Sequence, residues 1–298
     1  MVEATTAPPE TGSATSGAPA VQAALENIAH IATLPEITVK IIDLVENPES
    51  TARDLHQVIE NDPALCARIL KVVNSAFYGL PGQIGSINRA IVLLGLNAVK
   101  NIAIAVSLTK LFSGSQVTPT FSARDLWVHS ICVGVGSRLL SGKIGLRLPP
   151  DEAFLGGLMH DIGIMVELQA DRAKLLAMLD QHQQGKTFLD AEQQVFGADH
   201  QQFGQGLCEK WKFPSAFSFV TGYHHQPLAL DAESRTLTAL VYVADRLAVQ
   251  GGFGYTGTVA DTDIDTQVLD ALKLTEHAIE EVREELPEAI EVAEQLTN

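Results

Sequence analysis

The chain has 298 residues and carries 36 acidic against 20 basic side chains, a formal net charge of −16 at pH 7. This length predicts one large domain or two small ones, and a hydrophobic content of 46% predicts that most of the chain folds. The acidic excess argues against a nucleic-acid or anionic-membrane surface, because binding phosphates needs clustered lysine and arginine. We therefore expect neither nucleic acid nor membrane as a partner.

The cysteines and the first residues are typical of a soluble cytoplasmic protein. Cys66, Cys132 and Cys208 are widely spaced and form no CxxC pair, so a disulfide framework is not expected. The chain begins without a basic segment followed by an apolar one, so we expect no signal peptide, and no apolar run has the length of a membrane span. Residues 1–20 are mainly Ala, Thr, Pro, Gly and Ser, and we expect them to form a disordered tail.

From Val21 onward the spacing of apolar residues is helical. Thr51 opens one segment with capping-box spacing, and Asp62-Pro63 opens the next with an N-cap and a helix-starting proline. We expect Leu70 to lie on the buried face of that second helix.

The stretch SINRAIVLLGLNAVKNIAIAVSLTKLF predicts two helices joined near Gly95, an arrangement that invites comparison with a helix-turn-helix. Its charged residues are only Arg89, Lys100 and Lys110, too few for a phosphate-binding face, so we do not expect DNA binding. The next helix, FSARDLWVHSICVGVGSRLLSG, contains two glycines that predict close packing against another helix.

The remaining chain also reads as helical, with a loop at GGFGYTGT and an acidic last helix near 275–296. No convincing run of strands is present. The predicted fold is all-α, a compact multi-helix bundle. The further helices are expected near 151–168, 171–184, 187–196, 199–211, 214–225 and 234–249.

His160 and Asp161 interrupt the apolar segment AFLGGLMHDIGIMVEL. A carboxylate among so many apolar neighbours is costly unless it is paired, hydrogen-bonded or bound to a metal. The structural alternative is that the two side chains cap each other or a neighbouring helix end.

Two further pairs could supply ligands. Asp125 and His129 are four residues apart and share one face of a helix. Asp199 and His200 begin another helix, where the structural alternative is an N-cap followed by a first-turn residue.

The last candidates lie near helix ends or inside apolar helices. His224 and His225 end a helix, where adjacent side chains project about 100° apart, and the structural alternative is an interaction with the helix dipole. Asp245 interrupts an apolar helix beside Arg246, and the alternative is a surface ion pair.

Together these positions offer imidazoles and carboxylates from separate helices, which suit Fe, Mn, Zn or Ni. Such a metal pair can polarise a phosphoryl oxygen and deliver hydroxide. We expect one or two divalent transition-metal ions and no organic cofactor, with the ligands drawn from His129, His160, Asp161, His200, His224, His225, Asp245 and Asp125.

The order His129, His160-Asp161, Asp245 resembles the H…HD…D pattern of the HD superfamily of helical metal-dependent phosphohydrolases. Residues from about 25 to 250 resemble the HDOD family, the HD-related output domain of bacterial signalling proteins. The matching segments are LP at 34–35, NDPALCARILKVVNSAFYG, SINRAIVLLGLNAVKNI, FLGGLMHDIGIMVEL, HQQFG, W-x-x-P at 211–214 and YHH at 223–225.

The resemblance implies an all-helical signalling module that acts through protein partners. It divides the chain after the tail into an HDOD domain over 21–250 and a loop with an acidic helix over 251–298. Within the domain, 21–115 would form an N-terminal helical lobe and 120–250 an HD-like core.

The candidate ligands are also similar, position by position, to those of the HD-GYP cyclic di-GMP phosphodiesterases, where Asp161 would bridge two metals. Two features depart from that pattern: Ile164 stands where those enzymes have a phosphate-contacting lysine, and QPLALDAES replaces the GYP stretch. We therefore expect a signalling module that keeps a metal site. The alternative is a metal-dependent phosphohydrolase acting on a nucleotide or a cyclic dinucleotide.

Overall fold

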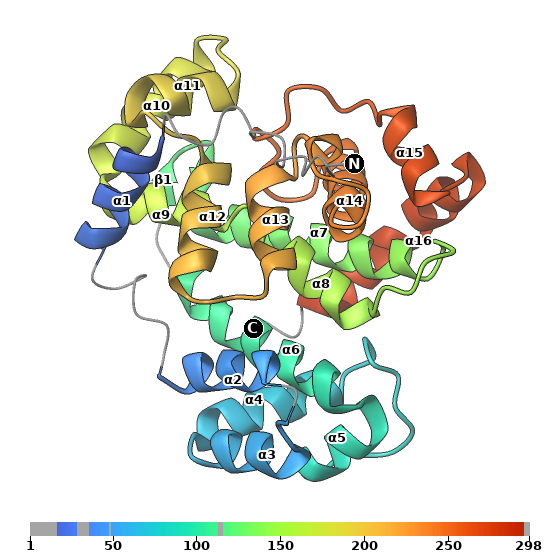
Figure 1. Ribbon diagram of the computed structural model, residues 1–298. Helices are drawn as coiled ribbons and strands as arrows, with labels where there is room; N and C mark the ends of the chain where they lie inside the picture. Colours follow the sequence, from blue (N-terminus) through green and yellow to red (C-terminus); the bar gives the residue numbers. More distant parts are fainter. Residues whose placement is uncertain (1–16, 29–35, 48, 113–115, 295–298) are drawn as a thin grey trace, which may run out of the picture.

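The computed structural model describes residues 17–28, 36–47, 49–112 and 116–294. Most of this part of the chain is helical, which confirms the predicted all-α class (Figure 1). The exception is a short antiparallel pair, β1 (Gln116–Thr118) and β2 (Phe121–Ser122), that the sequence did not predict. None of the described helices combines the length and apolar character needed to cross a membrane.

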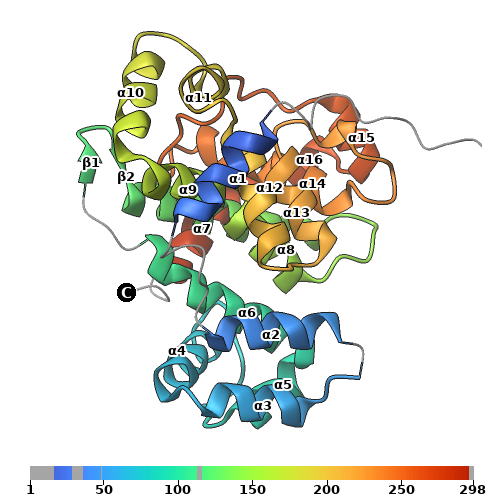
Figure 2. The ribbon, with the colours of Figure 1, turned by 60° about the vertical axis from the view of Figure 1, so that its left-hand side comes forward.

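The N-terminal lobe lies below the rest of the molecule in Figures 1 and 2. Its local signals work as expected: Thr51 forms a capping box with Asp54, and the Asp62 side chain accepts from the Leu65 amide. Gly95, with φ 91°, separates the last two helices. The lobe consists of α2 (Glu36–Glu46), α3 (Ala52–Glu60), α4 (Pro63–Val73), α5 (Ile87–Leu94) and α6 (Leu96–Leu108).

Two side chains of this lobe, Lys100 and Leu70, can be compared with what the sequence predicted for them. Lys100 is buried and donates to the carbonyl of Leu44, so it belongs to the packing of α6 against α2 and offers no charge to DNA. On α4, Ile69 is fully buried whereas Leu70 lies at the edge of the core, so the prediction for Leu70 was one position off.

The larger lobe is built around α7 and α8, which cross closely. At the crossing, a Cβ on Gly157 would lie 2.6 Å from the carbonyl oxygen of Val133 and 2.7 Å from the Cα of Gly134. The core helices are α7 (Ala123–Ser141), α8 (Pro150–Met159), α9 (Ile162–Ala170), α10 (Arg172–Gln183), α11 (Phe188–Phe196), α12 (His200–Lys210), α13 (Ser215–Tyr223) and α14 (Thr236–Gln250), followed by α15 (Thr266–Leu272) and α16 (Glu276–Glu294).

Three details differ from the sequence analysis. The helix expected over 151–168 is two helices, α8 and α9, separated by a turn at His160 and Asp161. The helix α15 was not predicted. The helix α1 (Ala18–Asn27) begins inside the expected tail and packs on α9 and α12 of the core rather than on the N-terminal lobe. Residues 1–16 of that tail, and the LP motif at 34–35, lie outside the described residues.

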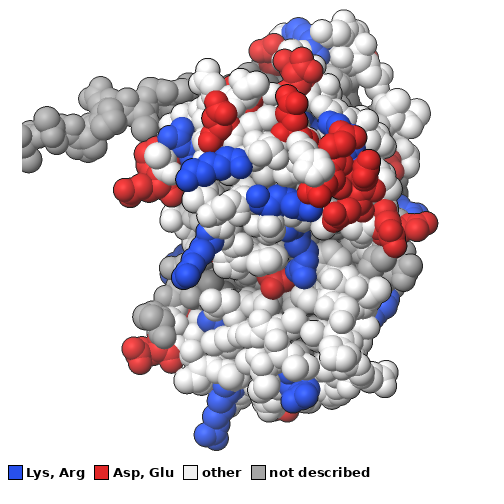
Figure 3. All heavy atoms as spheres, turned by 90° about the vertical axis from the view of Figure 1, so that its right-hand side faces the viewer, with Lys and Arg blue, Asp and Glu red and all other residues white. Residues whose placement is uncertain are grey.

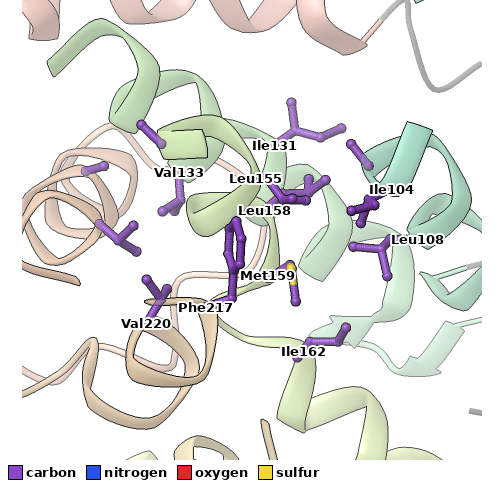
Figure 4. Packing of buried hydrophobic residues seen from close by; sticks show 14 of the residues in the cluster. Ile104, Leu108, Ile131, Val133, Leu155, Leu158, Met159, Ile162, Phe217 and Val220 are labelled. Atoms are coloured by element: carbon purple, nitrogen blue, oxygen red, sulfur yellow. The ribbon is translucent and has the colours of Figure 1, made fainter. Parts of the chain in front are cut away.

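The two lobes share one hydrophobic core. Figure 4 shows Ile104 and Leu108 of α6 beside Leu155, Leu158 and Met159 of α8, and these side chains are almost completely buried. Apolar burial of this kind is worth about 25 cal/mol for each Å² removed from water. The N-terminal lobe therefore packs directly against the helices that carry the histidines.

Candidate metal centre

The predicted ligand residues come from separate helices and converge inside the core. The structure brings together His129 from α7, His160 and Asp161 from the turn between α8 and α9, His200 at the start of α12, His224 and His225 just after α13, and Asp245 from α14. Asp125, one turn before His129, is absent from both groups of possible ligands found among the described residues.

Glycines fix the turn that carries His160 and Asp161. Gly157 lets α8 lie against α7, and Gly163 lets α9 lie against the start of α12, where a Cβ would collide with the carbonyl of His200. The backbone of Asp161 (φ −96°, ψ 15°) is outside the ideal helical region, so the chain changes direction at this residue. Close packing on both sides thus holds the turn against two other ligand-bearing helices.

The first ligand group surrounds Asp161 Oδ1. This oxygen lies 3.4 Å from His200 Nε2 and 3.3 Å from His224 Nε2. His200 Nε2 in turn lies 3.2 Å from His224 Nε2 and 3.1 Å from His225 Nε2. One donor atom from each of the four residues lies within 4.8 Å of the others.

The second group lies on the other side of the same carboxylate. Asp161 Oδ2 is 3.2 Å from His160 Nε2 and 3.9 Å from His129 Nε2, and His129 Nε2 is 3.1 Å from Asp245 Oδ1. Asp161 therefore presents one oxygen to each group, which is the arrangement a carboxylate needs to bridge two cations.

Hydrogen bonds at the outer ring nitrogens fix the histidine tautomers. His160 Nδ1 lies 2.7 Å from the carbonyl oxygen of Gly157, and His224 Nδ1 lies 3.1 Å from that of Val220. A carbonyl oxygen only accepts, so each Nδ1 carries the proton and donates it. In the neutral ring, Nε2 then points an unprotonated lone pair at the centre of the site.

Several of the atoms that face the centre of the site lack a hydrogen-bond partner. His160 Nε2, both carboxylate oxygens of Asp161 and Oδ2 of Asp245 are buried without a hydrogen-bond partner among the described residues. Acceptors that face one another at about 3 Å repel unless a proton or a cation lies among them. The donor set therefore fits a metal ion better than it fits a self-contained hydrogen-bond network.

Burial and mutual contacts shift the protonation of these groups. Burial disfavours the Asp161 anion, but His160, His224 and His200 together outweigh this effect, so the pKa of Asp161 is well below its usual value. Burial likewise opposes charge on His160, and Asp161 raises the pKa of that ring above its usual value. Burial lowers the pKa of His224 and, together with His224, that of His225. Those two imidazoles are thus held in the neutral form that binds metals.

Two acids that the sequence analysis missed support His200 from behind. Both Glu192 carboxylate oxygens lie 2.9 Å from His200 Nδ1, and one also accepts from the His200 amide at 3.2 Å. Glu167 lies beside Glu192, both are fully buried, and burial raises the pKa of each well above its usual value. Glu167 interrupts the apolar segment IGIMVEL, but Glu192 lies among Asp190, Gln193 and Gln194, so its sequence surroundings carry no signal.

The loop after α14 covers the second group. The Phe253 carbonyl lies 3.3 Å from His129 Nδ1, and Gly254, with φ 67°, leaves no room for a Cβ against the backbone of Asp125 and His129. The Asp125 carboxylate instead accepts from Ser122 Oγ at 2.6 Å, at the start of α7. Asp125 therefore helps to begin the helix, and its carboxylate is directed to Ser122 rather than to either ligand group.

The structural alternatives considered for the other candidates can also be judged. Asp199 is the N-cap of α12, as that alternative proposed, but His200 is completely buried in the cluster. Asp245 is buried as well, and its neighbour Arg246 stacks on the Tyr242 ring, so the two form no surface ion pair.

The doublet His224-His225 also departs from its expected geometry. Because α13 ends at Tyr223, both rings belong to the turn that follows, and both Nε2 atoms reach His200 instead of diverging by a helical angle.

The family can now be identified from the whole chain. The sequence profile of the HDOD domain matches residues 31–227, which is well over half of the chain and contains all of these histidines. The chain belongs to the HDOD family. This confirms the resemblance drawn from the motifs.

Three solved structures resemble this HDOD chain at 21–22% sequence identity, a level that shows the fold alone. They are an HDOD domain protein with unknown function from Geobacter sulfurreducens (TM-score 0.77, 94% of this chain and 98% of that one), a candidate signal transduction protein from Marinobacter aquaeolei VT8 (0.77, 97% and 66%) and a candidate phosphohydrolase from Shewanella amazonensis SB2B (0.72, 95% and 100%). An uncharacterised protein of Treponema pallidum (strain Nichols) is 24% identical over 224 residues, and the match spans 74% of this chain but only 42% of that protein.

Proposed function

We propose that this HDOD domain is a signal-transduction module that acts through protein partners and is organised around a closed metal centre. The observation that carries the proposal is the burial of the ligand set. His129, His160, Asp161, His200, His224 and Asp245 all have 0% of their surface exposed, and only His225 reaches partial exposure. A centre so enclosed suits an ion that holds helices together.

The residues on hand fit one or two divalent transition metals. Asp161, His200, His224 and His225 would hold one ion, and His129, His160 and Asp245 the other, with Asp161 shared. Mixed imidazole and carboxylate ligands suit Fe, Mn, Zn or Ni. Once bound, such an ion would supply a positive charge and Lewis acidity to this site.

Two features argue against efficient hydrolysis of a nucleotide or cyclic dinucleotide. Position 164, where the related phosphodiesterases have a lysine, is an isoleucine with no exposed surface, so it cannot neutralise charge on a phosphoryl group. The complete burial of most ligands also leaves little of the centre within reach of a bulky anionic substrate.

The surface of the N-terminal lobe offers a place for a protein partner. Figure 3 shows acidic side chains gathered on the upper half of one face, whereas the lower half, formed by the N-terminal lobe, is mostly uncharged. Val92 and Leu93 on α5 are 75% and 39% exposed. Exposed apolar side chains that lie together are typical of protein interaction sites.

We also place the domain in the cytoplasm. None of its three cysteines, all of which lie in the described part of the chain, forms a disulfide, as is usual for proteins of reducing compartments.

The alternative, a metal-dependent phosphohydrolase, is favoured by one observation: Asp161 presents an oxygen to each ligand group, as a carboxylate bridging two catalytic metals would. The test is turnover of cyclic di-GMP and of simple nucleotides by protein loaded with Mn, Fe, Zn or Ni in turn. We expect a metal-dependent rise in melting temperature without turnover. Hydrolysis at ordinary enzyme rates, lost in Asp161→Asn, would overturn the signalling proposal and establish the alternative.

A further inference from the structure

A separate cavity lies where the N-terminal lobe meets the larger lobe. Its volume is about 120 Å³, and its walls come from α4, α6, α7 and α8. Most of the lining is apolar, including Val72, Ile102, Val106, Ile131 and Leu158. An engineered apolar cavity of about 150 Å³ binds benzene, and this space is somewhat smaller but of the same order.

Two buried N–H groups on the walls of this cavity have no acceptor. Arg68 Nε, from α4, and Trp127 Nε1, from α7, both lack a hydrogen-bond partner among the described residues. Buried donors are rarely left unpaired in folded proteins, and an unpaired one is costly. Their position on opposite lobes around one cavity suggests that a ligand supplies the missing acceptor.

The charge of the lining indicates an anion. Arg68 contributes a positive charge, and no Asp or Glu occurs among the described residues that line the cavity. The Tyr78 hydroxyl, also in the lining, already donates to Asp151 at 2.9 Å. The unsatisfied groups are therefore donors and the net charge is positive, as in carboxylate-binding sites where arginine fixes the acid group.

We propose that this cavity binds a small monocarboxylate with an aromatic or branched apolar body. The apolar body fills the space between α6 and α8, and the carboxylate accepts hydrogen bonds from Arg68 and Trp127. The site is distinct from the histidine cluster, although α7 and α8 contribute to both. The proposal does not depend on metal binding or on the signalling role.

The test is a titration of 4-fluorobenzoate with the purified full-length chain, in which fluorine NMR measures binding of the probe. The neutral analogue 4-fluorobenzyl alcohol is the matched control. We expect saturable binding of the acid and much weaker binding of the alcohol. Arg68→Met keeps an apolar stem but removes the donors, and it should weaken acid binding about tenfold or more. Arg89→Met, at an exposed arginine of the same lobe, should leave binding unchanged.

A second variant covers the case in which Arg68→Met does not fold. Ala105→Leu adds bulk to the cavity wall and should abolish binding while the chain keeps its helical circular-dichroism spectrum. Failure of wild-type protein to bind the acid, equal affinity for acid and alcohol, or unchanged affinity in folded Arg68→Met would overturn the proposal.

Discussion

Glu192 supports the candidate metal centre from outside, because it contacts the outer ring nitrogen of His200 and not the centre itself. Its carboxylate accepts from His200 Nδ1, which fixes the ring and leaves Nε2 unprotonated toward Asp161. Such outer carboxylates orient histidine ligands and raise their basicity. Burial raises the pKa of the neighbouring Glu167 well above its usual value, and neither oxygen of its carboxyl group has a hydrogen-bond partner among the described residues.

Glu192→Gln should therefore weaken metal binding by about 10- to 100-fold without unfolding the domain. Glu167→Gln is the matched control, because it makes the same change at a neighbouring buried acid whose carboxyl oxygens make no hydrogen bond to His200, and it should change affinity little. Competition with a metallochromic chelator measures both variants. Equal affinities for wild type and Glu192→Gln would show that Glu192 does not position His200.

Adding one methyl group at Gly163 tests the close packing of α9 against α12 beside the turn at Asp161. Gly163→Ala would place a Cβ against the carbonyl of His200, where backbone atoms cannot move aside easily. We expect α9 and α12 to separate, with a loss of stability at the upper end of the range for point mutations, about 4 kcal/mol or more. Chemical denaturation measures this loss, and Gly145→Ala, at an exposed glycine with open space around it and no left-handed backbone, controls for general effects of substitution. A Gly163→Ala variant as stable as wild type would contradict the packing.

In α4, helical periodicity predicted the element correctly but not which of its residues are buried. The sequence predicted the helix, its N-cap and its proline correctly, yet placed Leu70 on the buried face, where the structure has Ile69. Helical spacing leaves neighbouring positions hard to separate when both are apolar. Contact with α6, which lies elsewhere in the sequence, decides between them.

Ile69→Ala should cost about 2–5 kcal/mol of unfolding free energy, because it empties a site with no exposed surface. Leu70→Ala should cost clearly less, since its side chain lies at the edge of the core. Urea denaturation of the two variants provides the comparison. A larger loss in Leu70→Ala would reverse the assignment of the buried face.

The break between α8 and α9 shows what local pattern could not predict. Apolar residues continue through His160 and Asp161, so the sequence favoured one helix over 151–168. The turn depends on two distant contacts, α7 at Gly157 and α12 at Gly163. The same limit applies to Glu192 and to Asp125, whose roles depend on packing and capping that residue spacing does not reveal.

For the whole molecule, the order of the sequence motifs predicted the fold class and the family. The all-α class and the family are confirmed, and six of the helices lie close to their expected ranges because caps, prolines and glycines mark their ends. The convergence of the histidines was predicted from imidazoles and carboxylates on separate apolar helices together with the family resemblance, and not from the spacing within any one helix. Their binding of metal remains a prediction.

Metal should stabilise the entire domain, since its ligands come from α7, α12, α14 and the ends of α8 and α13. Binding at 100 times the dissociation constant contributes about 2.7 kcal/mol, which corresponds to a rise in melting temperature of roughly 5 °C or more. Calorimetry before and after treatment with a chelator measures the shift. Identical melting curves would mean that no ion supports the fold.

The most direct test of the central claim is the metal content of the purified protein, measured by inductively coupled plasma mass spectrometry after exposure to Fe, Mn, Zn and Ni in turn. The buried lone pairs around Asp161 predict at least one tightly retained ion per chain. Asp161→Asn should lose this metal, whereas Asp125→Asn, at a carboxylate outside the cluster, should keep it. Wild-type protein that retains none of the four metals, or an Asp161→Asn variant with the full wild-type content, would contradict the account.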